Sequence, residues 1–182
     1  MSQETLNIAT SGNIYSAFFY GTLMVPGIFY SVCYGQTEVS SEIAKRHTFQ
    51  PAVLHGYCRR RRRHADSPGI TEDSGHEVFG TLATGLTEAI MTKLDYFEGR
   101  EYHRRRVKVK LLGHVSDPKD IGKVQEDERV AEVYVFNKTS DLEDVEWDLK
   151  EFCDERLPAW TQPGYVQGRC DPDIPAAVIG GQ

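Results

Sequence analysis

Apolar residues follow two different periods along this chain, and the period changes several times. Alternation of apolar and polar residues is typical of strands, whereas apolar residues three or four positions apart are typical of helices. The pattern predicts strands over 16–23, 51–58, 77–84, 101–113 and 129–137, and helices over 25–35, from Leu86 to Gly99, and over 144–157. This order indicates an α+β fold in which neighbouring strands are antiparallel.

The clearest helical pattern lies in the middle of the chain. Its apolar stripe has spacings of four, four and three residues and consists of Leu86, Ile90, Leu94 and Phe97. Thr87 is a suitable N-cap for this helix, and Gly99 is a suitable stop. Pro26 and Gly35 suit the two ends of the 25–35 helix, whose inner face is predicted to hold Ile28, Phe29 and Val32.

The chain has neither an internal repeat nor a linker long enough to divide it. We therefore predict one domain over 16–160, preceded by a flexible arm (1–15) and followed by a tail (161–182). Residues 114–128 are polar and contain proline and glycine, so we expect a long surface loop there.

Composition and charge narrow the class of protein. Acidic residues outnumber basic ones, 27 to 21, and the net charge of −6 argues against general nucleic-acid binding. The four cysteines form no CxxC pair, which is typical of reduced thiols in an intracellular protein. No histidine pair has metal-ligand spacing, so we predict no metal site. Because there is neither a secretory signal nor a transmembrane run, we expect a cytoplasmic protein with no membrane partner.

Two runs of arginine, Arg59–Arg63 and Arg104–Arg106, require an explanation. Alternate residues of a strand face opposite sides, so neither run forms a one-sided basic patch along a strand. No aromatic residue is interleaved in either run, so we expect no nucleic-acid partner. An ion-paired or solvated face is the simplest interpretation, and binding of a substrate carboxylate or phosphate is the functional one.

Two short segments are candidates for chemistry. In FYGTL (19–23) a strand runs into a glycine turn, where successive backbone N–H groups are able to hold an anion. Glu98 follows Phe97 by one position, so it lies about 100° round the helix, at the border of the apolar stripe. Partial desolvation there would raise its pKa and make it a better base near neutral pH.

Both candidates also have an ordinary structural interpretation. A strand that ends in a glycine turn is common in proteins without any bound anion. Glu101 is predicted to begin a strand, with Tyr102 on the opposite face. In that interpretation Glu98 and Glu101 are solvated charges that pair with nearby arginines, namely Arg100, Arg104 or Arg105.

Four segments in order resemble the γ-glutamylcyclotransferase-like proteins, in the branch named for the plant avirulence-induced gene. They are FFYGTLMVPGIF (18–29), VLHGYCRR with SPGI and VFGTL (53–82), LDYFEGREYHRRRVKV (94–109), and AEVYVF with WDLKEFCDERL (131–157). The resemblance covers about residues 17–158.

The resemblance implies a small mixed, mostly antiparallel, partly closed β-sheet flanked by helices. It implies an enzyme that needs no cofactor, in which the α-amine of a γ-glutamyl compound attacks its own γ-carbonyl and gives 5-oxoproline and a released amine or amino acid. It implies that Glu98 is the acid/base. The glutamyl moiety would be held by backbone groups of Tyr20, Gly21, Thr22 and Leu23, with Tyr102 and Tyr134 as walls or hydrogen-bond donors.

Three hypotheses for function follow. The first is this cyclotransferase, with a small-molecule partner such as a γ-glutamyl amino acid, a γ-glutamyl-amine or a glutathione-derived conjugate. The second is a non-catalytic protein that keeps the pocket for a small anionic metabolite. The third, the weakest, is a nucleic-acid-associated protein that uses residues 59–63. The oligomeric state is left open by the sequence pattern.

Overall fold

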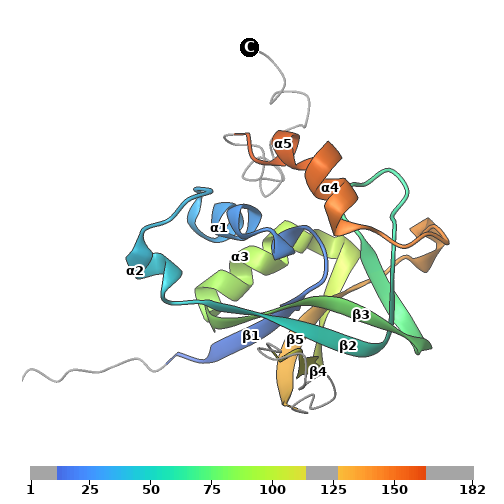
Figure 1. Ribbon diagram of the computed structural model, residues 1–182, viewed down its shortest axis with the longest axis horizontal. Helices are drawn as coiled ribbons and strands as arrows, with labels where there is room; N and C mark the ends of the chain where they lie inside the picture. The colour runs from blue at the N-terminus through green and yellow to red at the C-terminus, as the bar shows by residue number, and fades with distance from the viewer. Residues whose placement is uncertain (1–11, 114–126, 163–182) are drawn as a thin grey trace, which may run out of the picture.

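The computed structural model of the chain describes residues 12–113 and 127–162 (Figure 1). Its strands form a closed barrel in the order β1-β3-β2-β4-β5. The bounds of the strands are β1 (Ile14–Phe19), β2 (Thr48–Arg60), β3 (Gly69–Thr87), β4 (Tyr102–Leu111) and β5 (Glu128–Phe136). The helices are α1 (Pro26–Tyr34), α2 (Ser41–Ala44), α3 (Glu88–Glu98), α4 (Leu149–Glu155) and α5 (Leu157–Trp160).

The first strand closes the barrel. β1 pairs antiparallel with β3, where Phe18 lies opposite Leu82, and parallel with β5, where Ala17 lies opposite Glu132. The β2–β3 and β4–β5 pairs are antiparallel. The sheet is therefore mixed, mostly antiparallel and closed, which confirms the predicted fold class.

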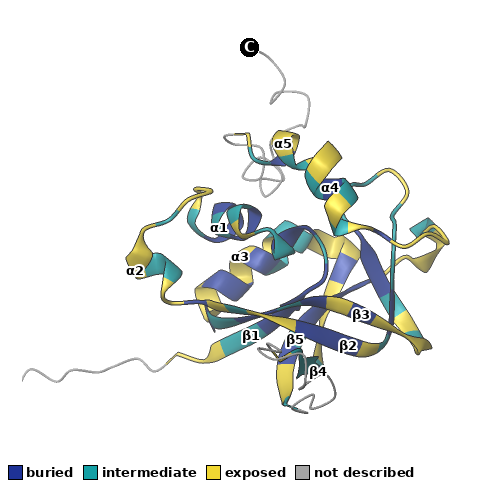
Figure 2. Ribbon diagram, in the orientation of Figure 1, coloured by how far each residue is buried: buried dark blue, intermediate teal, exposed yellow. Residues whose placement is uncertain are grey.

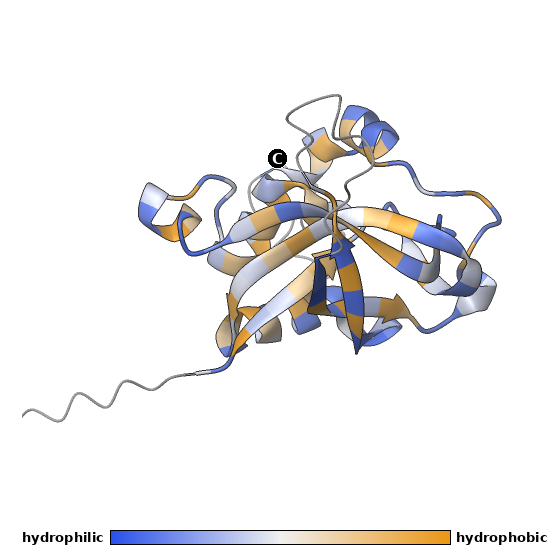
Figure 3. Ribbon diagram, turned by 60° about the horizontal axis from the view of Figure 1, so that its bottom comes forward, coloured by the Kyte–Doolittle hydropathy of each residue, from blue (hydrophilic) through white to orange (hydrophobic). Residues whose placement is uncertain are grey.

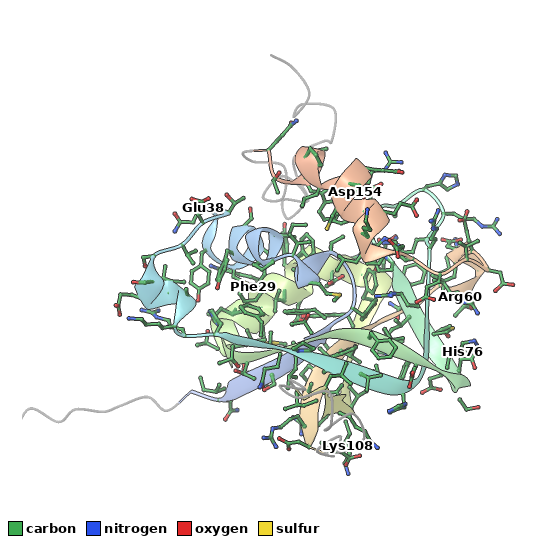
Figure 4. The ribbon with its side chains drawn as sticks, in the orientation of Figure 1. Phe29, Glu38, Arg60, His76, Lys108 and Asp154 are labelled. Carbon is green, nitrogen blue, oxygen red and sulfur yellow. The ribbon has the colours of Figure 1, made fainter. Side chains whose placement is uncertain are left out.

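Alternation along the strands produces two cores. The interior of the barrel holds residues from every strand, among them Phe18, Leu54 and Val109. The neighbouring residues Ala17 and Phe19 of β1 point to the other side, where they pack with α1 and α3. Figure 2 shows buried residues on α1 and α3, which lie next to each other on this side of the sheet, and Figure 4 shows Phe29 in that layer. The same alternation appears as changing hydropathy along the strands in Figure 3.

The helix ends follow the sequence signals. The side chain of Thr87 accepts a hydrogen bond from the backbone N–H of Ile90, at 3.3 Å, and so caps α3. Gly99 ends α3 at φ 68°, and Gly35 ends α1 at φ 75°, both in the region that favours glycine. The predicted inner face of α1 is buried as expected.

Several predicted boundaries are wrong. The first strand ends at Phe19 instead of residue 23, because a 3-10 turn, η1 (Thr22–Met24), follows it. Glu101 does not begin a strand but belongs to a second 3-10 turn, η2 (Gly99–Glu101). The strands predicted over 51–58 and 77–84 are longer, since together they form the extended β2–β3 ladder.

The last helix is shorter than predicted and divided in two. Asp148 caps α4 by accepting a hydrogen bond from the N–H of Glu151 at 2.7 Å, so the helix begins only at Leu149. Val145, which falls inside the helix predicted over 144–157, is 48% exposed and precedes the observed helix. Most of the predicted loop over 114–128 lies outside the described residues, and β5 begins at Glu128. The domain boundaries at 15 and 160 stay predictions.

Within residues 12–113 and 127–162, no helix has the length and apolar character needed to cross a bilayer.

Gly80 is expected to be essential for the β1–β3 contact. A Cβ atom at this position would lie 2.3 Å from the carbonyl oxygen of Phe19 and 2.7 Å from the ring of Phe18. We expect Gly80→Ala to lower the free energy of unfolding by about 1–3 kcal/mol in urea titrations, because such overpacking forces the strands apart. Gly75→Ala is the control, since its Cβ would meet nothing closer than 3.6 Å. Equal stability of the two variants would contradict this account of barrel closure.

Candidate functional site

A cavity of about 360 Å³ opens where β1 leaves the barrel. The η1 turn, the end of α3, the start of β4 and the segment between β2 and β3 contribute its walls. All the candidate site residues from the sequence line it, namely Glu98, Tyr20, Gly21, Thr22, Leu23, Tyr102 and Tyr134. The structure therefore brings together three segments, at 20–23, 98–102 and 134, of which the first two are about 75 residues apart in the sequence.

The turn after β1 contributes Gly21, Thr22 and Leu23 to the lining of the cavity. The first N–H groups of a helical turn have no acceptor inside it, so they are available to an anion. Tyr20 is anchored because its hydroxyl donates to the carbonyl oxygen of Tyr134 at 2.6 Å. Gly21 allows the turn to approach Pro68, since a Cβ atom there would lie 2.8 Å from the proline ring. Any other residue would push these two walls of the cavity apart.

Glu98 is the last residue of α3 and lies against the cavity. Its exposure is intermediate, because the cavity opens to one side while protein surrounds the rest. Burial raises the pKa of Glu98 from 4.5 to about 8, the nearby Arg62 opposes that shift, and the negative charge of Glu101 adds to it. This carboxyl therefore keeps its proton to a higher pH than an exposed glutamate does.

Arg62 is the cation of the cavity, and the sequence did not single it out. Its Nη2 lies 2.7 Å from the carboxylate of Glu101, and its side chain is 10% exposed. Its Nη1 donates to the hydroxyl of Tyr102 at 3.1 Å, and its guanidinium stacks over the ring of Phe136 at 4.5 Å. Because Glu101 holds Arg62, the positive charge is shared between two carboxylates, and Glu98 forms no ion pair within the described residues.

The hydroxyls of Tyr102 and Tyr134 are both engaged within the protein. Tyr102 donates to the carbonyl oxygen of Pro68 at 2.7 Å. Tyr134 donates to the carboxylate of Asp95 at 2.8 Å, and Asp95 also pairs with Arg104 at 2.9 Å. These contacts favour the role of walls over that of donors to a ligand.

The ion-pair interpretation of the two glutamates is only partly supported. Glu101 does form an ion pair, but with Arg62 and not with a neighbour in sequence. The run of five arginines is extensively ion-paired with the segment before and within α4, as expected of a structural run. These pairs are Arg59–Glu146, Arg60–Asp144 and Arg61–Glu151.

Two further walls of the cavity were missed by the sequence. One is the loop from His64 to Pro68, where His64 adopts φ 62°, and its only signal was the SPGI segment. The other is Trp160 on α5, which is 1% exposed and donates its indole N–H to the carboxylate of Asp66 at 3.0 Å. No periodicity marked Trp160, because α5 spans only four residues.

The described residues contain neither a disulfide bond nor a cluster of side chains suited to a metal ion. Cys33, Cys58 and Cys153 form no disulfide bond within the described residues, and Cys170 lies outside them. Over the described ranges, no three His, Cys, Asp or Glu side chains gather in a way that could hold a metal ion.

Comparison with known proteins places the chain in a family. The sequence model described as "Gamma-glutamyl cyclotransferase, AIG2-like" matches residues 17–153. The chain belongs to this AIG2-like γ-glutamyl cyclotransferase family. Among its relatives in Arabidopsis thaliana, Protein AIG2 B is 30% identical over 128 residues, which are 68% of each chain. Protein AIG2 C is 27% identical over 139 residues, 76% of this chain and 72% of the relative.

Solved structures share the fold of this chain at low identity. A solution structure from Arabidopsis thaliana has a TM-score of 0.55 and 23% identity, and the match covers 84% of this chain and 81% of that one. A structure named Gamma-glutamyl cyclotransferase has a TM-score of 0.51 and 14% identity, with 72% and 69% covered. These likenesses support the AIG2-like fold, and they carry no information on the substrate.

The buried carboxyl of Glu98 is expected to make stability depend on pH. Its folded pKa, about 8, exceeds the ordinary 4.5, so the stabilisation from the protonated form is complete below about pH 4.5 and is lost as pH rises through about 8. We therefore expect the difference in melting temperature, Glu98→Gln minus wild type, to increase by several degrees as pH rises from about 4.5 to about 8. Above about pH 8 this difference should stay constant.

The control for this measurement is Glu42→Gln. Glu42 lies on α2 with 80% of its side chain exposed, so its variant should follow wild type at every pH. A melting-temperature difference between Glu98→Gln and wild type that does not change with pH would contradict the burial of this charge.

Proposed function

We propose that this protein is a γ-glutamylcyclotransferase that converts a γ-glutamyl compound into 5-oxoproline and a free amine or amino acid. The observation that carries the proposal is a carboxyl with a raised pKa, Glu98, in the same cavity as the anion-binding turn at Gly21. Membership of the AIG2-like γ-glutamyl cyclotransferase family supports the same chemistry.

Proton transfer is the task assigned to Glu98. The substrate's α-ammonium must lose a proton before its nitrogen attacks the γ-carbonyl carbon. The α-amino group of a peptide has a pKa of about 8, and that of the substrate is higher because it lies beside a free carboxylate. The raised pKa of Glu98, about 8, therefore brings the two groups closer and lowers the free-energy cost of moving the proton. The arriving ammonium also favours the ionised carboxyl, because opposite charges stabilise each other.

The bond changes then balance within one substrate molecule. The nitrogen–carbon bond of the ring forms as the γ-carbonyl becomes a tetrahedral oxyanion. Glu98 returns its proton to the leaving nitrogen as the original amide bond breaks. The ring nitrogen, which carries two hydrogens after the attack, gives one of them to the carboxylate of Glu98, so the products are 5-oxoproline and the amine. Glu98 passes this second proton to the released amine or to water, which restores its starting state. Because nucleophile and electrophile belong to one bound molecule, holding it in a folded shape supplies much of the rate.

The turn and the charged pair have separate roles in this proposal. The N–H groups after Tyr20 hold the carboxylate of the glutamyl head, and so orient its amine towards Glu98. Burial raises the pKa of Glu98 to about 8, and within that shift the charge of Arg62 lowers it while the charge of Glu101 raises it. The aromatic walls exclude water from the reacting centre.

Release of 5-oxoproline tests the proposal directly. We expect wild type to form it from one or more members of a panel of γ-glutamyl amino acids, γ-glutamyl-amines and glutathione conjugates. Glu98→Gln should fold but lose about 10²–10⁴-fold in kcat, since a general acid/base contributes that much. Glu42→Gln, far more exposed, should keep full activity.

Two outcomes would contradict this assignment. Full activity of Glu98→Gln would remove Glu98 from the reaction. The other outcome is that wild type releases no 5-oxoproline from any compound of the panel while the same compounds raise its melting temperature. That result would indicate a binding protein without turnover.

The effect of Glu101 on the pKa of Glu98 gives a second prediction. For wild type we expect kcat/KM to fall about tenfold per pH unit below about pH 8, where Glu98 takes up a proton. Glu101→Gln removes a like charge and frees Arg62 to stabilise the carboxylate, so the acid limb of the profile should move to lower pH. A limb that stays in place, or moves to higher pH, would contradict the roles given to this pair.

A further inference from the structure

Arg59, the first residue of the arginine run, contacts the proposed glutamyl-binding turn from outside the cavity. It lies near the end of β2, and its side chain is only 12% exposed. Its Nη1 donates to the carbonyl oxygen of Tyr20 at 2.9 Å and to that of Phe79 at 3.3 Å. Arg59 is not a wall of the cavity, so it acts on any ligand only through the turn.

The other side of Arg59 is held by the segment before α4. Its Nη2 donates to the carboxylate of Glu146 at 3.1 Å, and its guanidinium lies over the ring of Trp147 at 5.5 Å. Trp147 is itself fixed, because its indole N–H donates to the carbonyl oxygen of Asp66 at 2.7 Å. One guanidinium therefore joins β1, β3 and the segment that leads into α4.

The bond to Tyr20 has a consequence on the opposite side of the same peptide unit. A trans peptide is planar, and its C=O and N–H point in opposite directions. The N–H of that unit belongs to Gly21, so holding the Tyr20 carbonyl towards Arg59 holds the Gly21 N–H away from it. A cation on the carbonyl also polarises the unit, which makes the N–H a stronger donor.

We infer that Arg59 is a positioning residue, which orients and strengthens the Gly21 N–H for the carboxylate of the γ-glutamyl substrate. The inference rests on the proposed function. An arginine suits this position because several rigidly placed donors are needed at once, whereas lysine offers a single flexible point charge.

The neighbour in the run provides a matched control. Arg60 pairs with Asp144 at 2.8 Å, and its side chain is 25% exposed. Neither the turn nor the cavity is among its contacts over the described part of the chain. Arg60→Met thus removes the same charge from the same strand without touching Tyr20.

Steady-state kinetics on the active γ-glutamyl compound test the inference. We expect Arg59→Met to raise KM about tenfold or more, the loss that corresponds to one hydrogen bond to a charged group. Its kcat should stay within about threefold of wild type, and the acid limb near pH 8 should not move, because Glu98 is untouched. Arg59→Lys should give an intermediate KM, and Arg60→Met should match wild type.

The outcomes separate this inference from the proposed function. Equal KM values for Arg59→Met and Arg60→Met would overturn the positioning role, and so would a loss in kcat with a displaced acid limb. If Arg59→Met fails to fold, the KM of Arg59→Lys decides the question. An intermediate KM would support the inference. A wild-type KM would overturn it, because the arginine would then be required for folding and not for binding of the substrate.

A second measurement applies if wild type releases no 5-oxoproline from any compound. Hydrogen exchange of the amides of residues 20–24 should then be faster in Arg59→Met than in Arg60→Met, which supports the orientation of the turn by Arg59. Equal exchange in the two variants would overturn that orientation, independently of the failure of the proposed function.

Discussion

Closure of the sheet through β1 is the constraint on which the rest of the molecule depends. β1 has only six residues, yet it pairs with β3 on one side and with β5 on the other. Its end at Phe19 therefore lies at the rim of the barrel, where the η1 turn emerges beside the last turn of α3. A candidate site made of segments far apart in the sequence follows from this closure, and from glycines that let the walls approach.

The electrostatics of the cavity arise from an imbalance of charge. Two carboxylates, Glu98 and Glu101, share one guanidinium, that of Arg62. Glu101 takes the direct contact, so Glu98 is left desolvated with a like charge nearby, and its pKa rises. A buried carboxyl of this kind reduces stability progressively as pH rises from about 4.5 to about 8, and carboxyls with strongly raised pKa values cluster at functional sites.

The arginine run illustrates how similar residues in succession take up different environments. Arg60 forms an ion pair near the surface, Arg59 is enclosed behind the turn, and Arg62 stacks on aromatic rings inside the cavity wall. The negative partners come mostly from the segment of 144–151, nearly ninety residues further along the chain. The run therefore fastens this segment to the barrel, and it explains why a chain with net negative charge carries five consecutive arginines.

The sequence by itself determined the order of elements, the caps of α3 and the two segments that carry the candidate site. Those features depend on local physics: periodic apolar residues, a threonine that caps, glycines that accept positive φ, and a carboxylate next to a helix stripe. Only the tertiary structure decided that Arg62 faces Glu98, that Arg59 holds the Tyr20 carbonyl, and that Trp160 closes a wall of the cavity. The reason is that each of these contacts joins residues roughly 35 to 140 positions apart, and which of several identical arginines makes a given contact depends on strand register and barrel closure, which no local pattern encodes.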